Sequence, residues 1–267
     1  MIYTLSNHHQ KLTIDTLGAQ ILSWQKLQNS NNSNAQPVNI LVNSNNPKRS
    51  GMPIMFPFCG PLKDNVFQYS GQIIPQHGFA RSSQFQLKSQ TKNTITMSLQ
   101  SQDLDPIWQV SYPFVFELLF EVKLLNSGIT TSLRLHNQDN KDIPVSPGFH
   151  PYFAVEQKSK TNIKISNTSF DAQLLPWFTG VEAQFLRNPS QYLIQTNNWK
   201  LSCTDNSSLS CGGINQSLPC QLLTVWAGEV ADFVCIEPMS QPFDSINTNP
   251  ILVPVNGVYD LNYTFEF

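Results

Sequence analysis

Apolar residues at alternate positions, in short runs, constrain the fold of this chain more than any other feature. In TITMSLQ (94–100), Ile95, Met97 and Leu99 alternate with threonine and serine, which is the period of a strand with one buried face. Comparable runs recur between turn residues and 18 prolines, and helical periodicity is hard to find. We therefore expect an all-β fold, a large antiparallel β-sandwich, with residues 1–267 forming one domain. The clearest other runs are KLTIDTL, AQILSWQKL, FVFELLFEVKLL, GITTSLRLHNQ, QLLTVWAG, DFVCIEP and LNYTFEF.

Composition narrows the class of protein. Hydrophobic residues make up 40% of the chain, charged residues 13%, and the formal net charge is −2. A chain this weakly charged, with no run rich in lysine or arginine, does not suit nucleic acid or an anionic membrane surface. No stretch is apolar for long enough to cross a membrane, and the first residues lack a basic start followed by an apolar block. A cytoplasmic protein, monomeric or weakly dimeric, is the default expectation.

Two polar stretches interrupt the strand-like pattern. Residues 27–39 are rich in asparagine, and residues 204–219 are rich in serine and glycine. Neither contains enough apolar surface to become ordered by packing. We expect both to be loops inserted between strands.

The five cysteines match neither a zinc-binding spacing nor a C-x-x-C pair. We expect free thiols, with a bridge between Cys211 and Cys220 as the alternative. His8 and His9 are adjacent, so on a strand they point to opposite faces. No metal ion and no cofactor are therefore expected. The cysteines are Cys59, Cys203, Cys211, Cys220 and Cys235.

Three stretches carry residues suited to chemistry, and the first is residues 48–81. It contains Arg49 and ends in QHGFAR, where His77 precedes Gly78. A glycine permits a tight turn that can direct the imidazole away from the strand. Phe79 is a candidate apolar wall, Arg81 lies four residues after His77, and Cys59 falls inside this stretch. The alternative is a loop that packs its aromatic residues and leaves both arginines in solvent.

The second stretch is VSPGFHPYF (145–153). Its prolines and aromatic residues hold His150 in a stiff frame, with Pro151 directly after it and Tyr152 next. Histidine exchanges a proton near neutral pH, and general acid catalysis requires a rigidly placed proton donor. The alternative is a histidine in the core whose hydrogen bonds are satisfied.

The third stretch is ADFVCIEPMSQPFDSINTNP (231–250). Glu237 follows an apolar strand-like run and precedes Pro238, which we expect to end the strand. Partial desolvation of such a carboxylate raises its proton affinity and makes it a usable base. The alternative is a surface glutamate at the end of a strand. Taken together, the histidines, the carboxylate and the aromatic faces are the components of a sugar-binding site.

The three stretches together resemble the galactose mutarotase-like (aldose 1-epimerase) superfamily. The resemblance begins at TLGAQILSWQ (16–25), which is similar to that family's first hairpin. It continues through GMPIMFPFCG, QHGFAR and GFHPYF to FVCIEP. It implies an open carbohydrate cleft on one sheet of a β-sandwich, and interconversion of α and β anomers without a cofactor.

The resemblance also implies roles for individual residues. Glu237 matches the general base, which takes the proton from the C1 hydroxyl of the sugar. His150 matches the general acid, which protonates the ring oxygen, and His77 matches a second histidine at the anomeric end. Phe79 and Tyr152 are expected to contact the substrate.

HGFAR and KRSGMP resemble the hexose-6-phosphate mutarotase branch more than the free-galactose enzymes. In that branch, arginines matching Arg49 and Arg81 lie near a sugar phosphate. Arginine suits a phosphate because it can donate two parallel hydrogen bonds. Two residues depart from the family patterns: Ser50 replaces a glycine, and Pro61 stands where many free-sugar relatives carry an arginine.

The expected function is therefore an aldose 1-epimerase acting on a hexose or a hexose 6-phosphate. The alternative is a protein that binds or senses a sugar without turnover. Retention of His77, His150 and Glu237 argues against that alternative, because binding alone requires no matched acid and base.

Overall fold

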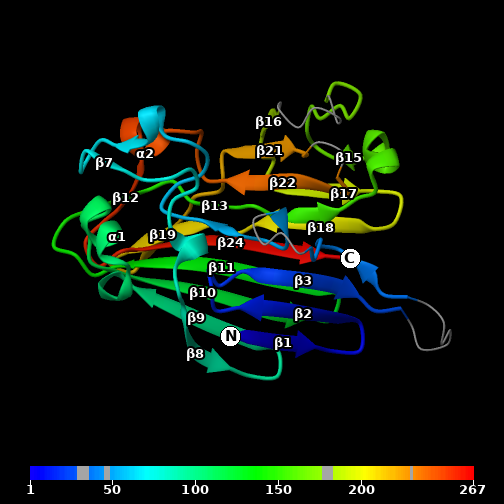
Figure 1. The fold of residues 1–267 in the computed structure, drawn as a ribbon, viewed down its shortest axis with the longest axis horizontal. Helices are drawn as coiled ribbons and strands as arrows, with labels where there is room; N and C mark the ends of the chain where they lie inside the picture. Colours follow the sequence, from blue (N-terminus) through cyan, green and yellow to red (C-terminus); the bar gives the residue numbers. More distant parts are fainter. Residues whose placement is uncertain (29–35, 45–48, 176–182, 229–230) are drawn as a thin grey trace.

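Antiparallel sheets make up most of the regular structure in the computed structural model (Figure 1). The structure describes residues 1–28, 36–44, 49–175, 183–228 and 231–267. Within these residues the largest sheet has ten strands, and long neighbouring strands such as β10 and β11 pair over their whole length. Its order is β15 (Lys164–Ile165), β17 (Gln191–Gln195), β18 (Lys200–Asp205), β24 (Val258–Glu266), β11 (Gly128–Asn137), β10 (Phe116–Leu125), β9 (Thr94–Gln100) and β8 (Gln86–Gln90), with β19 (Ser208–Cys211) and β20 (Ile214–Ser217) attached beside β24.

A six-stranded sheet forms the layer that carries the site. Its order is β16 (Ala183–Arg187), β21 (Leu222–Trp226), β22 (Phe233–Met239), β13 (Gly148–Phe149) and β5 (Ile54–Met55), with β14 (Tyr152–Ala154) also paired to β22. The remaining sheets are β1 (Ile2–Ser6), β2 (Gln10–Asp15), β3 (Ile21–Lys26) and β4 (Val38–Asn39), then β12 (Ile143–Val145) with β23 (Ile251–Val253), and β6 (Val66–Phe67) with β7 (Gln72–Ile73). Helices are short: α1 (Pro106–Ser111), α2 (Ser245–Thr248) and 3₁₀ turns at Lys63–Asn65, Ala80–Ser82, Ser101–Asp103 and Gln157–Asn162.

The main core lies between the ten-stranded and six-stranded sheets. Phe149 of β13 packs edge-on against Phe120 of β10 and Tyr263 of β24, and all three side chains are fully buried. Edge-to-face contacts are a favoured arrangement of aromatic rings. Ile95 and Met97 of β9 are also fully buried, as their alternation predicts. The prediction of an all-β sandwich is confirmed.

The serine- and glycine-rich stretch at 204–219 is ordered, so the prediction of a loop there is wrong. Residues 208–217 form the hairpin β19–β20, and β19 pairs with β24 through Leu209 and Tyr259. The turn at Gly212 and Gly213 has positive φ. Backbone hydrogen bonds to an existing sheet order this segment without requiring a buried apolar face. Of the stretch at 27–39, residues 29–35 lie outside the described residues, and Val38–Asn39 form β4.

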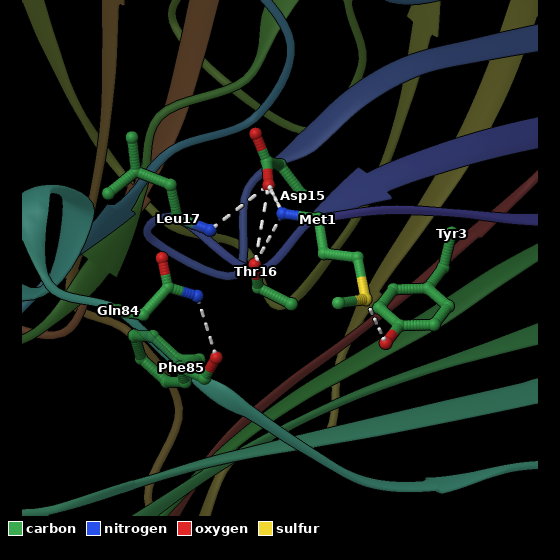
Figure 2. Close-up of polar contacts among 7 residues, drawn as sticks. All are labelled: Met1, Tyr3, Asp15, Thr16, Leu17, Gln84 and Phe85. Carbon is green, nitrogen blue, oxygen red and sulfur yellow. Dashed lines mark hydrogen bonds and ion pairs between the residues drawn. The ribbon is translucent and has the colours of Figure 1, made fainter.

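The turn between β2 and β3 joins the small N-terminal sheet to the chain entering β8. The Asp15 carboxylate accepts hydrogen bonds from the Met1 ammonium (3.0 Å) and from the backbone N–H of Leu17 (3.2 Å), as Figure 2 shows. The Thr16 carbonyl accepts the backbone N–H of Phe85 at 2.9 Å. This turn therefore anchors the expected first hairpin against the segment that follows the His77 loop.

The described helices include none that is long and apolar enough to span a membrane. All five cysteines are free thiols, so the alternative of a bridge between Cys211 and Cys220 is wrong.

Candidate active site

Alternation along β22 determines what faces the site. Val234 and Ile236 belong to the main core, whereas Phe233 and Cys235 cluster on the opposite face of the strand. Because side chains alternate on a strand, Glu237 shares the face of Phe233 and Cys235. Glu237 is 4% exposed. The same strand thus supplies both a core wall and an acidic group beneath a cavity.

The strand does not end at Pro238, which corrects the expectation that Glu237 lies at a strand end. β22 runs on to Met239, and Pro238 pairs with Leu223 of β21. On its other side β22 pairs with Gly148 of β13 and then with β14 from Tyr152 onward. Between these two points no strand is paired continuously with β22. Proline has no backbone N–H to donate. Pro238 is tolerated here because the strand formed by β13 and β14, on that side of β22, is interrupted.

His150 stands opposite Glu237 within this interruption. The pairings Gly148 with Met239 and Tyr152 with Cys235 have the same register, and that register sets residue 150 across from residue 237. The backbone N–H of His150 donates to the carbonyl of Pro53 instead of to β22. His150 Nε2 lies 3.4 Å from Glu237 Oε1.

Two rows of side chains therefore cross the face of this sheet. The pairings of β16 with β21 and of β21 with β22 extend each row by two residues. The first row is His150, Glu237, Thr224 and Phe185. The second row is Tyr152, Cys235, Trp226 and Ala183.

His77 completes the group of acid and base side chains. It has a φ of 68° and Gly78 a φ of 72°, and a side chain at Gly78 would collide with the Phe56 carbonyl oxygen. The backbone N–H of Gly60 donates to His77 Nδ1 at 3.0 Å. In the neutral ring the proton therefore resides on Nε2. The His77 ring lies edge-on to that of His150, 5.2 Å away.

These residues line a cavity of about 500 Å³. Tyr152 stacks nearly parallel on His150, with ring centroids 4.6 Å apart and an interplanar angle of 4°. Arg49 lies over the ring of Trp226, and Arg81 donates from Nη2 to the Gln76 carbonyl at 3.2 Å. The lining residues are Arg49, Pro61, Gln76, His77, Arg81, His150, Tyr152, Ala183, Phe185, Thr224, Trp226, Glu237 and Phe243.

Two residues of the first sequence stretch lie away from the cavity. Phe79 is fully buried and packs on Phe56 and Trp108. The expectation that it forms an apolar wall for the substrate is therefore wrong, because the turn that brings His77 to the cavity directs the next aromatic ring into the core. Cys59 is also buried, and its thiol donates to the Ser146 carbonyl.

Burial shifts the proton affinities of the central groups in opposite directions. Burial raises the pKa of Glu237 to about 8. Burial lowers the pKa of His77 to about 3 and that of His150 well below its usual value, and the charge of Arg81 acts in the same direction on both rings. A buried group avoids the charged form. Near neutral pH the Glu237–His150 pair therefore holds one proton, on the carboxyl group.

Ligand-type atoms of His150, Cys235 and Glu237 lie within 4.8 Å of one another. Such a set has the composition of a metal site. Two arginines line the same cavity and oppose a cation, and burial together with Glu237 raises the pKa of the Cys235 thiol, which disfavours the thiolate that a metal requires. We therefore interpret these groups as an acid–base site with a neighbouring thiol.

Sequence reasoning missed the lining residues that belong to strands of ordinary composition. Thr224, Trp226 and Phe185 reach the cavity because β21 and β16 pair with β22 in a particular register. Phe243 reaches it from the segment before α2. No local motif marks these positions, and the aromatic residues on β21 and β16 are the only signal that the sequence offers.

A family model covers most of this chain. The aldose 1-epimerase family model matches residues 1–208. The chain belongs to the aldose 1-epimerase family. Two curated relatives of this chain from Lactococcus lactis, the plasmid and chromosomal forms of Protein LacX, are each 32% identical to it over 111 residues. That match covers 38% of this chain and 36% of each relative, so it spans little more than a third of their length.

Solved structures share the whole fold with this family member. The Slr1438 protein of Synechocystis has a TM-score of 0.80 at 22% identity and covers 100% of this chain and 95% of its own. A galactose mutarotase related enzyme from Lactobacillus acidophilus has a TM-score of 0.76 at 18% identity, covering 100% and 97%. A galactose mutarotase-like protein from Lactobacillus casei has a TM-score of 0.72 at 18% identity, covering 100% and 99%. At these identities the likeness establishes the galactose mutarotase-like fold.

Proposed function

We propose that this protein interconverts the α and β anomers of a hexose or a hexose 6-phosphate by general acid and base catalysis. The observation that carries the proposal is the placement of His150 Nε2 at 3.4 Å from Glu237 Oε1, in a cavity that His77 also lines. Ring opening of a sugar requires a base at the C1 hydroxyl and an acid at the ring oxygen. Catalytic contacts in a ligand-free protein are often somewhat longer than a hydrogen bond.

Glu237 is the base and His150 the acid in this mechanism. The single proton of the pair moves from the Glu237 carboxyl to His150 Nε2 across their contact when substrate binds. The carboxylate then takes the proton of the C1 hydroxyl while His150 protonates the ring oxygen, and the C1–O5 bond breaks to give the open-chain aldehyde. Rotation about C1–C2 and the reverse proton transfers close the ring on the other face.

His77 holds the anomeric end in this mechanism. Its Nδ1 accepts the Gly60 N–H, so its Nε2–H remains available to donate to a sugar oxygen. Because burial keeps the pKa of His77 low, the ring stays neutral. Its role is to orient the reacting oxygen, which supports general acid transfer by His150.

Arg49 and Arg81 support a phosphosugar as the preferred substrate. Both guanidinium groups act electrostatically on the Tyr152 hydroxyl, although burial dominates and raises the pKa of that phenol. Both arginines also line the same cavity. A phosphate placed between them would receive charge-assisted hydrogen bonds, each worth roughly 1.5–3 kcal/mol.

Anomer exchange measured by NMR, with glucose, galactose and their 6-phosphates, tests the proposal. We expect accelerated exchange, with a higher kcat/KM for the 6-phosphates. Arg81→Ala should lower kcat/KM for the phosphosugar by about ten- to a hundredfold more than for the free sugar. Arg187→Ala is the matched control, since Arg187 is exposed on β16 and lies outside the cavity.

Each contrary outcome has a distinct meaning. Equal losses for both substrates in Arg81→Ala would show that Arg81 braces the His77 loop through Gln76. Saturable sugar binding without accelerated exchange would make the protein a non-catalytic sugar-binding protein.

A further inference from the structure

The proposed acid, His150, is held without a hydrogen bond from a neighbour at its second ring nitrogen. His150 Nδ1 is buried, and no other residue in the described part of the chain bonds to it. A catalytic histidine is commonly oriented by a carbonyl or carboxylate at the nitrogen that does not react. His77 does have a partner at Nδ1, the Gly60 N–H. A contact of another kind therefore fixes the plane of the His150 ring.

The Tyr152 ring lies flat on that of His150. The two centroids are 4.6 Å apart and the interplanar angle is 4°. By contrast, the rings of His77 and Trp226 meet His150 edge-on, at 79° and 87°. A parallel neighbour in contact opposes tilting of the imidazole, because tilting would drive one edge of the ring into the neighbour's face. The stack thus keeps Nε2 directed at Glu237 Oε1, 3.4 Å away.

Tyr152 is itself fixed on several sides. Its backbone N–H donates to the Gly51 carbonyl at 2.8 Å, and the residue pairs with Cys235 of β22. The Phe233 ring packs edge-on against the Tyr152 ring, with centroids 5.0 Å apart and an interplanar angle of 73°. The Tyr152 side chain is also buried. Its ring is therefore a rigid platform for the imidazole.

The platform also acts on charge. In the proposed mechanism the His150 ring becomes an imidazolium when Nε2 takes the proton of Glu237. Burial lowers the pKa of His150 well below its usual value, and the charges of His77 and Arg81 act in the same direction. The ionisable groups around the ring include Glu237 and Cys235 of β22, His77 and Arg81 of the segment before β8, Arg49 on the cavity wall and Tyr152 itself. The face of an aromatic ring attracts a cation that lies within about 6 Å of its centroid, so the Tyr152 face favours the charged form of His150.

We propose that Tyr152 is a positioning residue, whose ring holds the His150 imidazole in the plane required for proton transfer and stabilises the imidazolium that forms there. This inference rests on the proposed function and adds a residue that acts through His150. It is distinct from a contact between Tyr152 and the substrate. Loss of a substrate contact raises KM, whereas loss of the platform lowers kcat and leaves KM nearly unchanged.

Fluorination of the ring at position 152 tests the platform with almost no change of shape. Fluorine withdraws electron density from the face of the ring and so weakens its attraction for a cation. Phenylalanine and its mono-, di- and trifluorinated forms replace Tyr152, and NMR measures kcat and KM for anomer exchange with the fastest-reacting of glucose, galactose and their 6-phosphates. We expect kcat to fall with each added fluorine, by about tenfold in all relative to Tyr152→Phe, while KM stays within about twofold.

Tyr152→Leu and a matched control complete the experiment. Leucine keeps an apolar side chain but no aromatic face, so kcat should fall by about ten- to a hundredfold, because the imidazole also loses its fixed plane. The same fluorinated residues at Phe153 are the control. Phe153 follows Tyr152 on β14 but is buried in the core, where it packs on Trp199 and Phe265. Fluorination there should leave kcat unchanged.

The outcomes separate the platform from the proposed function. A kcat that stays constant along the fluorine series at position 152, or an equal fall for the series at Phe153, would overturn the platform and leave the proposed function in place. A rise in KM at constant kcat would assign Tyr152 to substrate binding and would likewise overturn the platform. Absence of accelerated exchange with every sugar in the wild type would overturn the proposed function, and the platform with it.

Discussion

Two polar clusters in this protein, one around the half-buried Asp205 and one around the buried Glu237, are built on opposite principles. Asp205 accepts hydrogen bonds from the backbone N–H of Cys220 (2.7 Å), from Asn188 Nδ2 (2.8 Å) and from the Tyr263 hydroxyl (2.9 Å). In the other cluster, the Glu237 carboxyl faces His150 at 3.4 Å. The first cluster satisfies its polar groups internally, whereas the second directs its polar groups into a cavity.

The difference shows how to separate a structural cluster from a functional one. The Asp205 cluster joins β18 and β24 to the segments that flank β16 and β21, and so ties the two large sheets together. Fully satisfied buried networks add rigidity. The Glu237 cluster carries shifted proton affinities in a cavity, which is the usual condition of catalytic groups. One cluster is expected to support stability and the other to support turnover.

Glu237→Gln should produce the largest effect and should confine it to activity. The amide keeps the shape of the side chain but cannot take a proton, so kcat for anomer exchange should fall by about 10²–10⁴-fold. Glu266→Gln is the matched control, because Glu266 is exposed on β24. NMR exchange rates at saturating sugar measure the effect. Near-normal turnover in Glu237→Gln would remove that residue from the mechanism.

Asp205→Ala should lower stability and leave activity unchanged. It leaves the Cys220 N–H and the Tyr263 hydroxyl without their acceptor, so the free energy of unfolding should fall by about 3 kcal/mol. Turnover per folded molecule should be retained. Denaturant unfolding monitored by fluorescence measures the change, with the exposed Asp103→Ala as control. A loss below about 0.5 kcal/mol, or a loss of kcat in folded protein, would erase the distinction between the clusters.

The most gradual predicted effect is a gain in stability that grows with pH. Burial raises the pKa of Glu237 to about 8, so the folded protein retains a proton that the unfolded chain releases above about pH 4.3. The wild type therefore loses stability as pH rises through this window. Glu237→Gln avoids that loss, so its stability relative to the wild type should rise by about 1.4 kcal/mol for each pH unit between about pH 5 and pH 8. Unfolding at pH 5 to 8 measures the difference, which should be flat for Glu266→Gln. A flat difference for Glu237→Gln would mean that the carboxyl is already ionised.

Sequence alone predicts the fold well where the period of two is clean. Ile95 and Met97 of β9 are fully buried, as their alternation requires. The hairpin at 208–217 was not predicted, because its order comes from pairing with β24 and its own residues are half-exposed or exposed. Local composition reports apolar burial and does not report which edges are available for pairing.

In the candidate site, too, local sequence predicts some features, and others depend on tertiary neighbours. Sequence motifs marked His77, His150 and Glu237, and the structure brings these three together around one cavity. The motifs did not indicate that Phe79 turns into the core, or that β22 continues through Pro238. Both outcomes depend on tertiary neighbours, namely Phe56 and Trp108 around Phe79 and the interrupted strand beside Pro238. Thr224 and Phe185 required the strand register, which cannot be read from one sequence.

The interrupted strand beside β22 has a consequence for how this protein can change over time. His150 stands opposite Glu237 at a point where no ladder of backbone hydrogen bonds joins their strands, so the proposed acid and base are fixed by flanking pairs of residues. Thr224 and Phe185 lie farther along the same row as side chains on regular strands. Their replacement leaves the backbone pairing intact. On the proposed function, substrate preference can therefore drift through mutation at these positions while the proton chemistry is inherited unchanged.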